Sequence, residues 1–170
     1  MFRFILVLWF AMLSGLAQGE TRDVHQFFFD QKLGDFKAEL ANAKKEGKKG
    51  ILLMFEMDEC PWCHRMKMTI LNQSEVQDYY KKHFLVFSVD TKGDTAMIDF
   101  KGRETTEKKF SEENRVRATP VFGFIDLEGN MIHRLTGVTK DVDEFLLLGR
   151  YVVEGAYKTQ SFSVYKQGAR

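Results

Sequence analysis

Cys60 and Cys63 are the only cysteines in this chain of 170 residues, and Pro61 and Trp62 stand between them. They follow an apolar run, residues 51–55, and open a stretch with helical spacing of apolar residues. Two thiols at the start of a helix can close a tight disulfide ring, and the outer thiol lies where unpaired backbone N–H groups and the helix dipole favour a thiolate. We therefore predict a redox-active Cys60–Cys63 disulfide.

Three other functions of the pair have to be weighed. A purely structural disulfide is disfavoured because so short a ring constrains little entropy of the unfolded chain. A zinc site needs four ligands, and no second pair of Cys or His stands at ligand spacing, so no metal is predicted. His64 completes the pattern C-x-x-C-H, which also attaches c-type haem. The strand-like run before the motif and a Thr119–Pro120 step downstream disfavour haem, which is kept as a remote alternative.

The N-terminus has the pattern of a cleavable signal peptide, in which a short basic start precedes an apolar core, residues 4–13, and a tail of small residues. Ala17 and Gly19 suit the two positions that a signal peptidase recognises, so residues 1–19 are predicted to be removed. The apolar core is too short for a comfortable membrane span, although an uncleaved anchor is the alternative. The expected mature protein is a single domain, residues 20–170, in the periplasm.

Export changes the interpretation of the cysteines, because small exported domains usually use cysteines as structural staples, whereas this chain has only the closely spaced pair. About 150 mature residues are enough for one domain with a proper core, and the sixteen Phe of the chain can fill it. The formal net charge of +1 suggests neither nucleic acid nor an anionic membrane surface as a partner, and we expect a monomer.

Apolar periodicity predicts a mixed order of helices and strands. The segment 21–29, which ends in three consecutive Phe, is expected to pack on the surface of the domain. The polar segment 91–110 is predicted to be an inserted hairpin or loop. Ser74 and Gln77 suggest a capping box at the start of a helix. The predicted helices are residues 30–46, 63–71, 74–80 and 141–154, with 111–116 helical or irregular, and the predicted strands are residues 50–56, 84–90, 121–125 and 131–135.

This order of elements, with Cys-x-x-Cys at the first strand-to-helix junction, is similar to the thioredoxin fold, an α/β fold in which helices flank a central mixed sheet. The resemblance covers most of the mature chain. Within the superfamily the chain resembles the exported SoxW-type thioredoxins of sulfur-oxidising bacteria, through residues 53–56, 116–120 and 156–162. The resemblance implies a protein-disulfide oxidoreductase that requires no organic cofactor.

The resemblance also assigns roles to individual residues. Cys60 resembles the attacking thiol, expected to be exposed as the first residue on the helix, and Cys63 resembles the resolving thiol one turn within. Pro120 resembles the cis-proline that faces the cysteines, and Thr119 would offer its backbone to a substrate. A cis X-Pro bond lets the preceding residue pair strand-like with a peptide, whereas an ordinary trans proline opening an edge strand is the alternative.

Two further residues are candidates for supporting the site. Cytosolic thioredoxins carry a buried Asp in the preceding strand, where this chain has Met54. Strand alternation puts Glu56 on the same face and nearer the thiols, so it could accept the proton of Cys63, with a solvated strand end as the alternative. His64 follows the resolving cysteine, where a protonated imidazole could help to set the thiolate charge, and a plain surface histidine is the alternative.

The expected chemistry is thiol–disulfide exchange in the reducing direction. Pro61 and Trp62 add no positive charge, and Asp58 and Glu59 disfavour a thiolate. We therefore expect the pKa of the Cys60 thiol not to be extremely low and the disulfide to be a poor oxidant. The resemblance implies exported substrate proteins with disulfides or reactive cysteines, such as carriers of thiosulfate oxidation, and a membrane thiol electron carrier as reductant. The alternatives are a disulfide oxidase or isomerase, an apocytochrome thiol reductase, and a non-catalytic module that binds partners at the proline edge.

Overall fold

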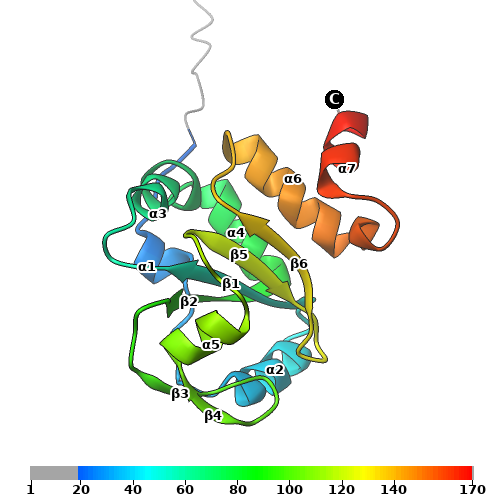
Figure 1. The fold of residues 1–170 in the computed structure, drawn as a ribbon. Helices are drawn as coiled ribbons and strands as arrows, with labels where there is room; N and C mark the ends of the chain where they lie inside the picture. Colours follow the sequence, from blue (N-terminus) through cyan, green and yellow to red (C-terminus); the bar gives the residue numbers. More distant parts are fainter. Residues whose placement is uncertain (1–18, 170) are drawn as a thin grey trace, which may run out of the picture.

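The computed structural model describes residues 19–169 and has a four-stranded mixed sheet with helices on both faces (Figure 1). The strand order is β2-β1-β5-β6, with β1 parallel to β2 and antiparallel to β5, and β5 antiparallel to β6. This arrangement confirms the predicted α/β class. The predicted signal peptide, residues 1–19, lies outside the described residues except for Gly19. The strands are β1 (Gly50–Glu56), β2 (Phe84–Asp90), β5 (Val121–Ile125) and β6 (Met131–Thr136).

The two faces of the sheet are covered by different helices (Figure 1). On one face lie α1 (Val24–Phe27), α3 (Pro61–Met66), the π-helical turn η1 (Lys67–Leu71), α4 (Ser74–His83) and α6 (Val142–Val153). On the other face lie α2 (Phe36–Lys45) and α5 (Glu107–Glu113). The chain ends with the 3₁₀ turn η2 (Ala156–Lys158) and α7 (Phe162–Gly168). None of the helices among residues 19–169 is long and apolar enough to cross a membrane.

Strand β1 is central, as its continuous apolar run predicts. It pairs with β2 on one side and β5 on the other, and successive side chains enter opposite cores because strand side chains alternate. Leu52 and Met54 lie in the core shared with α4 and α6, whereas Leu53 and Phe55 lie in the core shared with α2 and α5, and all four are fully buried. Burial of side chains of this size contributes about 1.5–3 kcal/mol each, so β1 is a rigid base for the loop that follows it.

The predicted helix 30–46 begins six residues too early, because α2 starts only after the cap Asp35, whose carboxylate accepts from Ala38 N. Before α2, Asp30 pairs with the free edge of β2. There Asp30 N donates to Val86 O over 2.7 Å, and the Asp30 carboxylate accepts from Val86 N over 2.7 Å. Unpaired strand edges attract such pairing, and this long-range pairing prevails over the local helical period.

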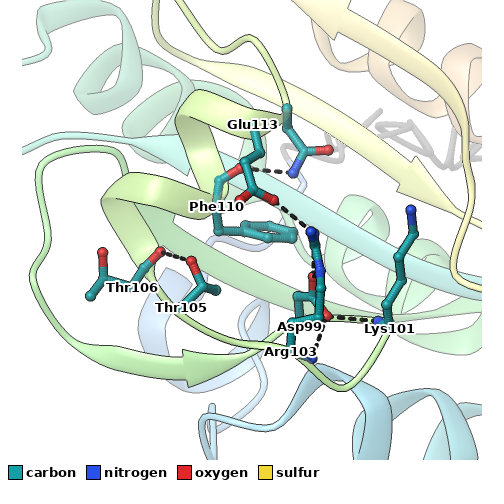
Figure 2. A network of polar contacts seen from close by, with 8 residues as sticks. Asp99, Lys101, Arg103, Thr105, Thr106, Phe110 and Glu113 are labelled. Atoms are coloured by element: carbon teal, nitrogen blue, oxygen red, sulfur yellow. Dashed lines mark hydrogen bonds and ion pairs between the residues drawn. The ribbon is translucent and has the colours of Figure 1, made fainter.

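The inserted segment is a hairpin, as predicted for residues 91–110, made of β3 (Ala96–Ile98) and β4 (Glu104–Thr106). It is followed at once by α5, which begins earlier than the predicted helical segment 111–116. Figure 2 shows the polar network that joins the hairpin tip to α5. Asp99 accepts from Arg103 Nε over 2.7 Å, and Arg103 Nη2 lies 2.8 Å from Glu113 Oε2.

The predicted capping box at the start of α4 is wrong. Ser74 is the first helical residue, and Gln73 at the cap position makes no side-chain hydrogen bond to the helix. The side chain of Gln77 is buried, its Nε2 donates to Leu71 O over 2.9 Å, and its Oε1 accepts no hydrogen bond from the described residues, so it makes no capping contact. Ser74 N donates to Glu20 O over 2.8 Å, so the N-terminal segment satisfies the helix end in place of a cap.

Candidate active site

The two cysteines are joined in a disulfide at the N-terminus of α3, with a Cα–Cα distance of 5.2 Å. Cys60 is the cap residue, and Pro61 occupies the first helical position, which suits proline because its missing N–H would have no partner there. Cys63 N donates a hydrogen bond to Cys60 Sγ over 3.0 Å. The prediction that Cys60 is exposed is wrong, because Cys60 is 5% exposed and Cys63 2% exposed, and both are buried. Position on the helix, and not exposure, distinguishes the two thiols.

The Thr119–Pro120 peptide bond is cis and lies just before β5, at the end of the sheet where β1 leads to the disulfide. Val121, the next residue, pairs with Phe55 near the end of β1, which leads to the cysteines. Pro120 O accepts from Gly137 N over 2.8 Å, which anchors the turn to the chain after β6. The Oγ1 atom of Thr119 is buried and has no hydrogen-bond partner in the described structure.

A cavity of about 290 Å³ opens between the disulfide and the ends of β1 and β2. Cys60 and Cys63 both line it, together with Ser88 of β2. The cavity thus brings the thiols together with ionisable groups from three other parts of the chain. These groups are His25, Glu56, Asp58, His64, Lys67 and Asp90.

Glu56 is the carboxylate held in place at this cavity. Its side chain is 13% exposed, its Oε2 lies 2.6 Å from Lys67 Nζ, and its Oε1 accepts from the hydroxyl of Ser88. Glu56 is therefore engaged in a polar cluster and is not a solvated strand end. Sequence reasoning missed Lys67 and Ser88, although Lys67 follows Cys63 by four residues and so lies on the same helix face. Ser88 carries no comparable local signal.

The outer face of α3 is exposed beside the disulfide. Trp62 is 54% exposed, and the guanidinium of Arg65 lies 5.6 Å from the centre of its ring. His64 is exposed and lines the cavity together with both cysteines. Glu59 is exposed as well, and a hydrogen bond from Lys92 lowers the pKa of its carboxyl group. Lys92 thus compensates one of the two negative charges expected to disfavour a thiolate.

Comparison with known protein families shows which family this fold and site belong to. The family profile of the thioredoxin-like domain matches residues 36–152, so the chain belongs to the thioredoxin-like family. With its Cys60–Cys63 pair at the start of α3, it is a protein-disulfide oxidoreductase of that family. Described residues contain no group of three or more His, Cys, Asp or Glu that could hold a metal ion. The family and the closed disulfide favour exchange chemistry over haem attachment.

Three solved structures illustrate the likeness. A thioredoxin-fold protein from Helicobacter pylori is 21% identical with a TM-score of 0.59, over 84% of this chain and 91% of that one. A thioredoxin from Thermus thermophilus is 26% identical with a TM-score of 0.54, over 70% of this chain and 84% of that one. The C-terminal domain of DsbD from Neisseria meningitidis, in the reduced form, is 22% identical with a TM-score of 0.50, over 68% and 91%. A search of curated proteins gave no match.

Proposed function

We propose that the protein is a periplasmic disulfide reductase, exported by the signal peptide that residues 1–19 predict. The observation that carries this proposal is the position of the Cys60–Cys63 disulfide, which caps α3 after the central strand β1, at the end of the sheet where Thr119 and Pro120 lead into β5. A thiolate at Cys60 would accept a hydrogen bond from the N–H of Cys63 and lie at the positive end of the dipole of α3. The first step of exchange is therefore assigned to Cys60.

The reaction is an exchange in which electrons and bonds balance. The Cys60 thiolate attacks a partner disulfide, the partner S–S bond breaks, and the leaving partner sulfur takes up a proton. Cys63 then loses its proton and attacks Cys60 Sγ, which breaks the mixed disulfide. The partner leaves with both sulfurs reduced, and the two electrons come from the Cys60–Cys63 pair, which ends oxidised.

Glu56 is proposed as the proton acceptor for Cys63 in the second step. Both residues line the same cavity, and general bases act through direct contact or through one water molecule. Thr119 and Pro120 are proposed to bind the substrate, as the thioredoxin-like resemblance implies, through strand-like pairing of the Thr119 backbone with an extended peptide. Trp62 would add an exposed apolar surface to that contact.

The SoxW-type resemblance suggests the physiological partners. The substrates would be cysteine-bearing carrier proteins of thiosulfate oxidation, and a membrane thiol electron carrier would return the Cys60–Cys63 pair to the dithiol. Reduction of apocytochrome thiols is the second candidate, and the genes that neighbour this one would discriminate between them.

A reductase assay tests the proposed activity directly. Reduced protein is mixed with insulin, whose two chains are joined by disulfides, in the presence of dithiothreitol. The unaltered protein should accelerate separation of the chains, and Cys60→Ser should abolish the acceleration. Equal rates for the two proteins would refute the function. Cell fractionation followed by N-terminal sequencing should find the mature protein in the periplasm, and a cytoplasmic protein that retains residues 1–19 would refute export.

A further inference from the structure

An ion pair between the buried Glu107 and the partly buried Lys32 lies beneath the inserted segment. Glu107, the first residue of α5, is only 5% exposed. Its Oε1 atom is bonded by the ammonium group of Lys32 and accepts from Asp90 N over 3.3 Å. Asp90 is the last residue of β2 and lines the cavity at the disulfide. The insertion thus holds the end of the strand that forms one wall of the redox site.

Lys32 extends this contact toward the site carboxylate. Its Nζ atom also donates to Ser88 O over 2.9 Å, and the hydroxyl of Ser88 donates to Glu56. Ser88 is therefore held through its carbonyl by the ion pair of the insertion, and it holds Glu56 through its side chain. A continuous series of polar contacts leads from Glu107 to the carboxylate in the cavity.

The start of the insertion is attached to the same place by two other contacts. Thr91 N donates to Glu56 O over 2.8 Å, which continues the pairing of β1 beyond the last residue of β2. Lys92 Nζ bonds Glu59 in the loop before the cysteines. The insertion therefore contacts the end of β1, which carries Glu56, and the loop that leads from Glu56 to the cysteines.

Stability alone gives a poor account of the Lys32–Glu107 pair. Desolvation offsets much of the attraction within a buried ion pair, and apolar replacements of similar volume are often as stable. The insertion already has an apolar anchor, because Phe110 is buried and its ring lies 5.6 Å from the ring of Phe36 and 5.9 Å from that of Phe55. The ion pair adds hydrogen bonds of defined orientation. Lys32 Nζ donates to Ser88 O and Glu107 Oε1 accepts from Asp90 N, and together these bonds fix the position of the end of β2.

We propose that residues 91–110 brace the redox site, with Lys32 and Glu107 as positioning residues that hold Ser88 and, through it, Glu56. The brace sets how readily Cys63 loses its proton and resolves a mixed disulfide. The inference rests on the exchange chemistry and not on its direction. The other charged groups that face Cys63 in the cavity are His25, Asp58, His64, Lys67 and Asp90, and the variants below leave all of them unchanged.

The test separates the two steps of exchange. Reduced protein is mixed with 5,5′-dithiobis(2-nitrobenzoate) in a stopped-flow instrument, where attack by Cys60 releases one equivalent of thionitrobenzoate and attack by Cys63 releases a second. The pH dependence of the second phase reports the deprotonation of Cys63. The variants are Glu107→Gln and the charge-neutral double variant Lys32→Met with Glu107→Leu.

Both variants should move the midpoint of the second phase by about half a pH unit or more, which is roughly a threefold change in rate at a fixed lower pH. Asp99→Asn is the matched control, because Asp99 is another buried carboxylate of the insertion and joins the hairpin tip to α5 by way of Arg103 (Figure 2). It should lower the melting temperature and leave the midpoint unchanged.

A folded double variant with the midpoint of the unaltered protein would overturn the proposal, as would a shift of the same size in Asp99→Asn. The double variant keeps the test decisive if Glu107→Gln fails to fold, because it leaves no buried charge unpaired. Failure of the unaltered protein to release two equivalents would instead refute the exchange chemistry, so the two failures are distinguishable.

Discussion

The backbone N–H of Cys63 points at Sγ of Cys60 and lies 3.0 Å from it. This contact makes the sulfur of Cys60 the cap of α3, in the place where an oxygen of Ser, Thr or Asp usually accepts. Once the disulfide is reduced, the same N–H stabilises a thiolate at Cys60 and offers nothing equivalent to Cys63. The two thiols therefore differ by their positions on one helix, although their exposed fractions are nearly equal.

This asymmetry predicts which cysteine captures partners. Cys63→Ser should accumulate covalent complexes through Cys60, because the mixed disulfide forms and has no resolving thiol. Cys60→Ser should capture none. The complexes are counted on non-reducing gels after incubation with a disulfide-linked peptide and disappear with dithiothreitol. Capture by Cys60→Ser and not by Cys63→Ser would reverse the assigned roles.

The direction of electron flow depends on how strongly the site stabilises the Cys60 thiolate. Lys92 compensates Glu59, and Lys67 is already bonded to Glu56, so no unpaired lysine among these groups is left to favour the thiolate. We expect a reduction potential near the value of about −270 mV for thioredoxin. Equilibration in glutathione buffers, with the thiols counted by mass spectrometry, measures it. A potential less negative than about −180 mV, the value of protein disulfide isomerase, would favour the oxidase or isomerase function.

The proposed base predicts a specific kinetic defect. Glu56→Gln keeps an acceptor for the Ser88 hydroxyl and loses the carboxylate, so release of the partner by Cys63 should slow by about 100-fold while attack by Cys60 persists. Glu59→Gln is the matched control in the loop that follows β1, and loss of its exposed ion pair with Lys92 should change the rate by about twofold at most. If Glu56→Gln resolved mixed disulfides at the normal rate, Glu56 would not be the base.

The stability of the domain should depend on pH through His133. Burial lowers the pKa of His133, whose ring lies 5.0 Å from that of Tyr151 and 6.4 Å from that of Phe162. The unfolded chain therefore binds a proton more readily, so this contribution is complete above about pH 6.5 and is lost as the pH falls below it. Urea unfolding at several pH values measures the loss, which His133→Phe should reduce.

His25→Gln provides the control for this pH dependence, because His25 is exposed. Burial also lowers the pKa of His83, so some loss of stability at acidic pH should remain in His133→Phe. The prediction fails if His133→Phe and the unaltered protein lose the same free energy of unfolding between about pH 7.5 and pH 5.5.

Local patterns were sufficient for the strands and for the start of the cysteine helix. Strand β1 and strand β2 have the predicted bounds, because a continuous run of apolar residues between polar ends is stable only when neighbours cover both faces. The sequence also predicts that a helix begins at the cysteines, and α3 begins at Pro61, directly after Cys60 and two residues before the predicted range 63–71. The sequence by itself also determined which disulfide can form, because Cys60 and Cys63 have no other cysteine to pair with.

Only the tertiary structure decided which polar groups surround the cysteines. Lys32 precedes Glu107 by 75 residues, and the two meet because Asp30 pairs with Val86 at the edge of β2 and α2 begins only at Phe36. The contacts of Glu56 with Lys67 and Ser88 likewise join three elements. Apolar periodicity reports which face of an element is buried, whereas the partner of a charged side chain depends on packing between elements, and no local pattern encodes that packing.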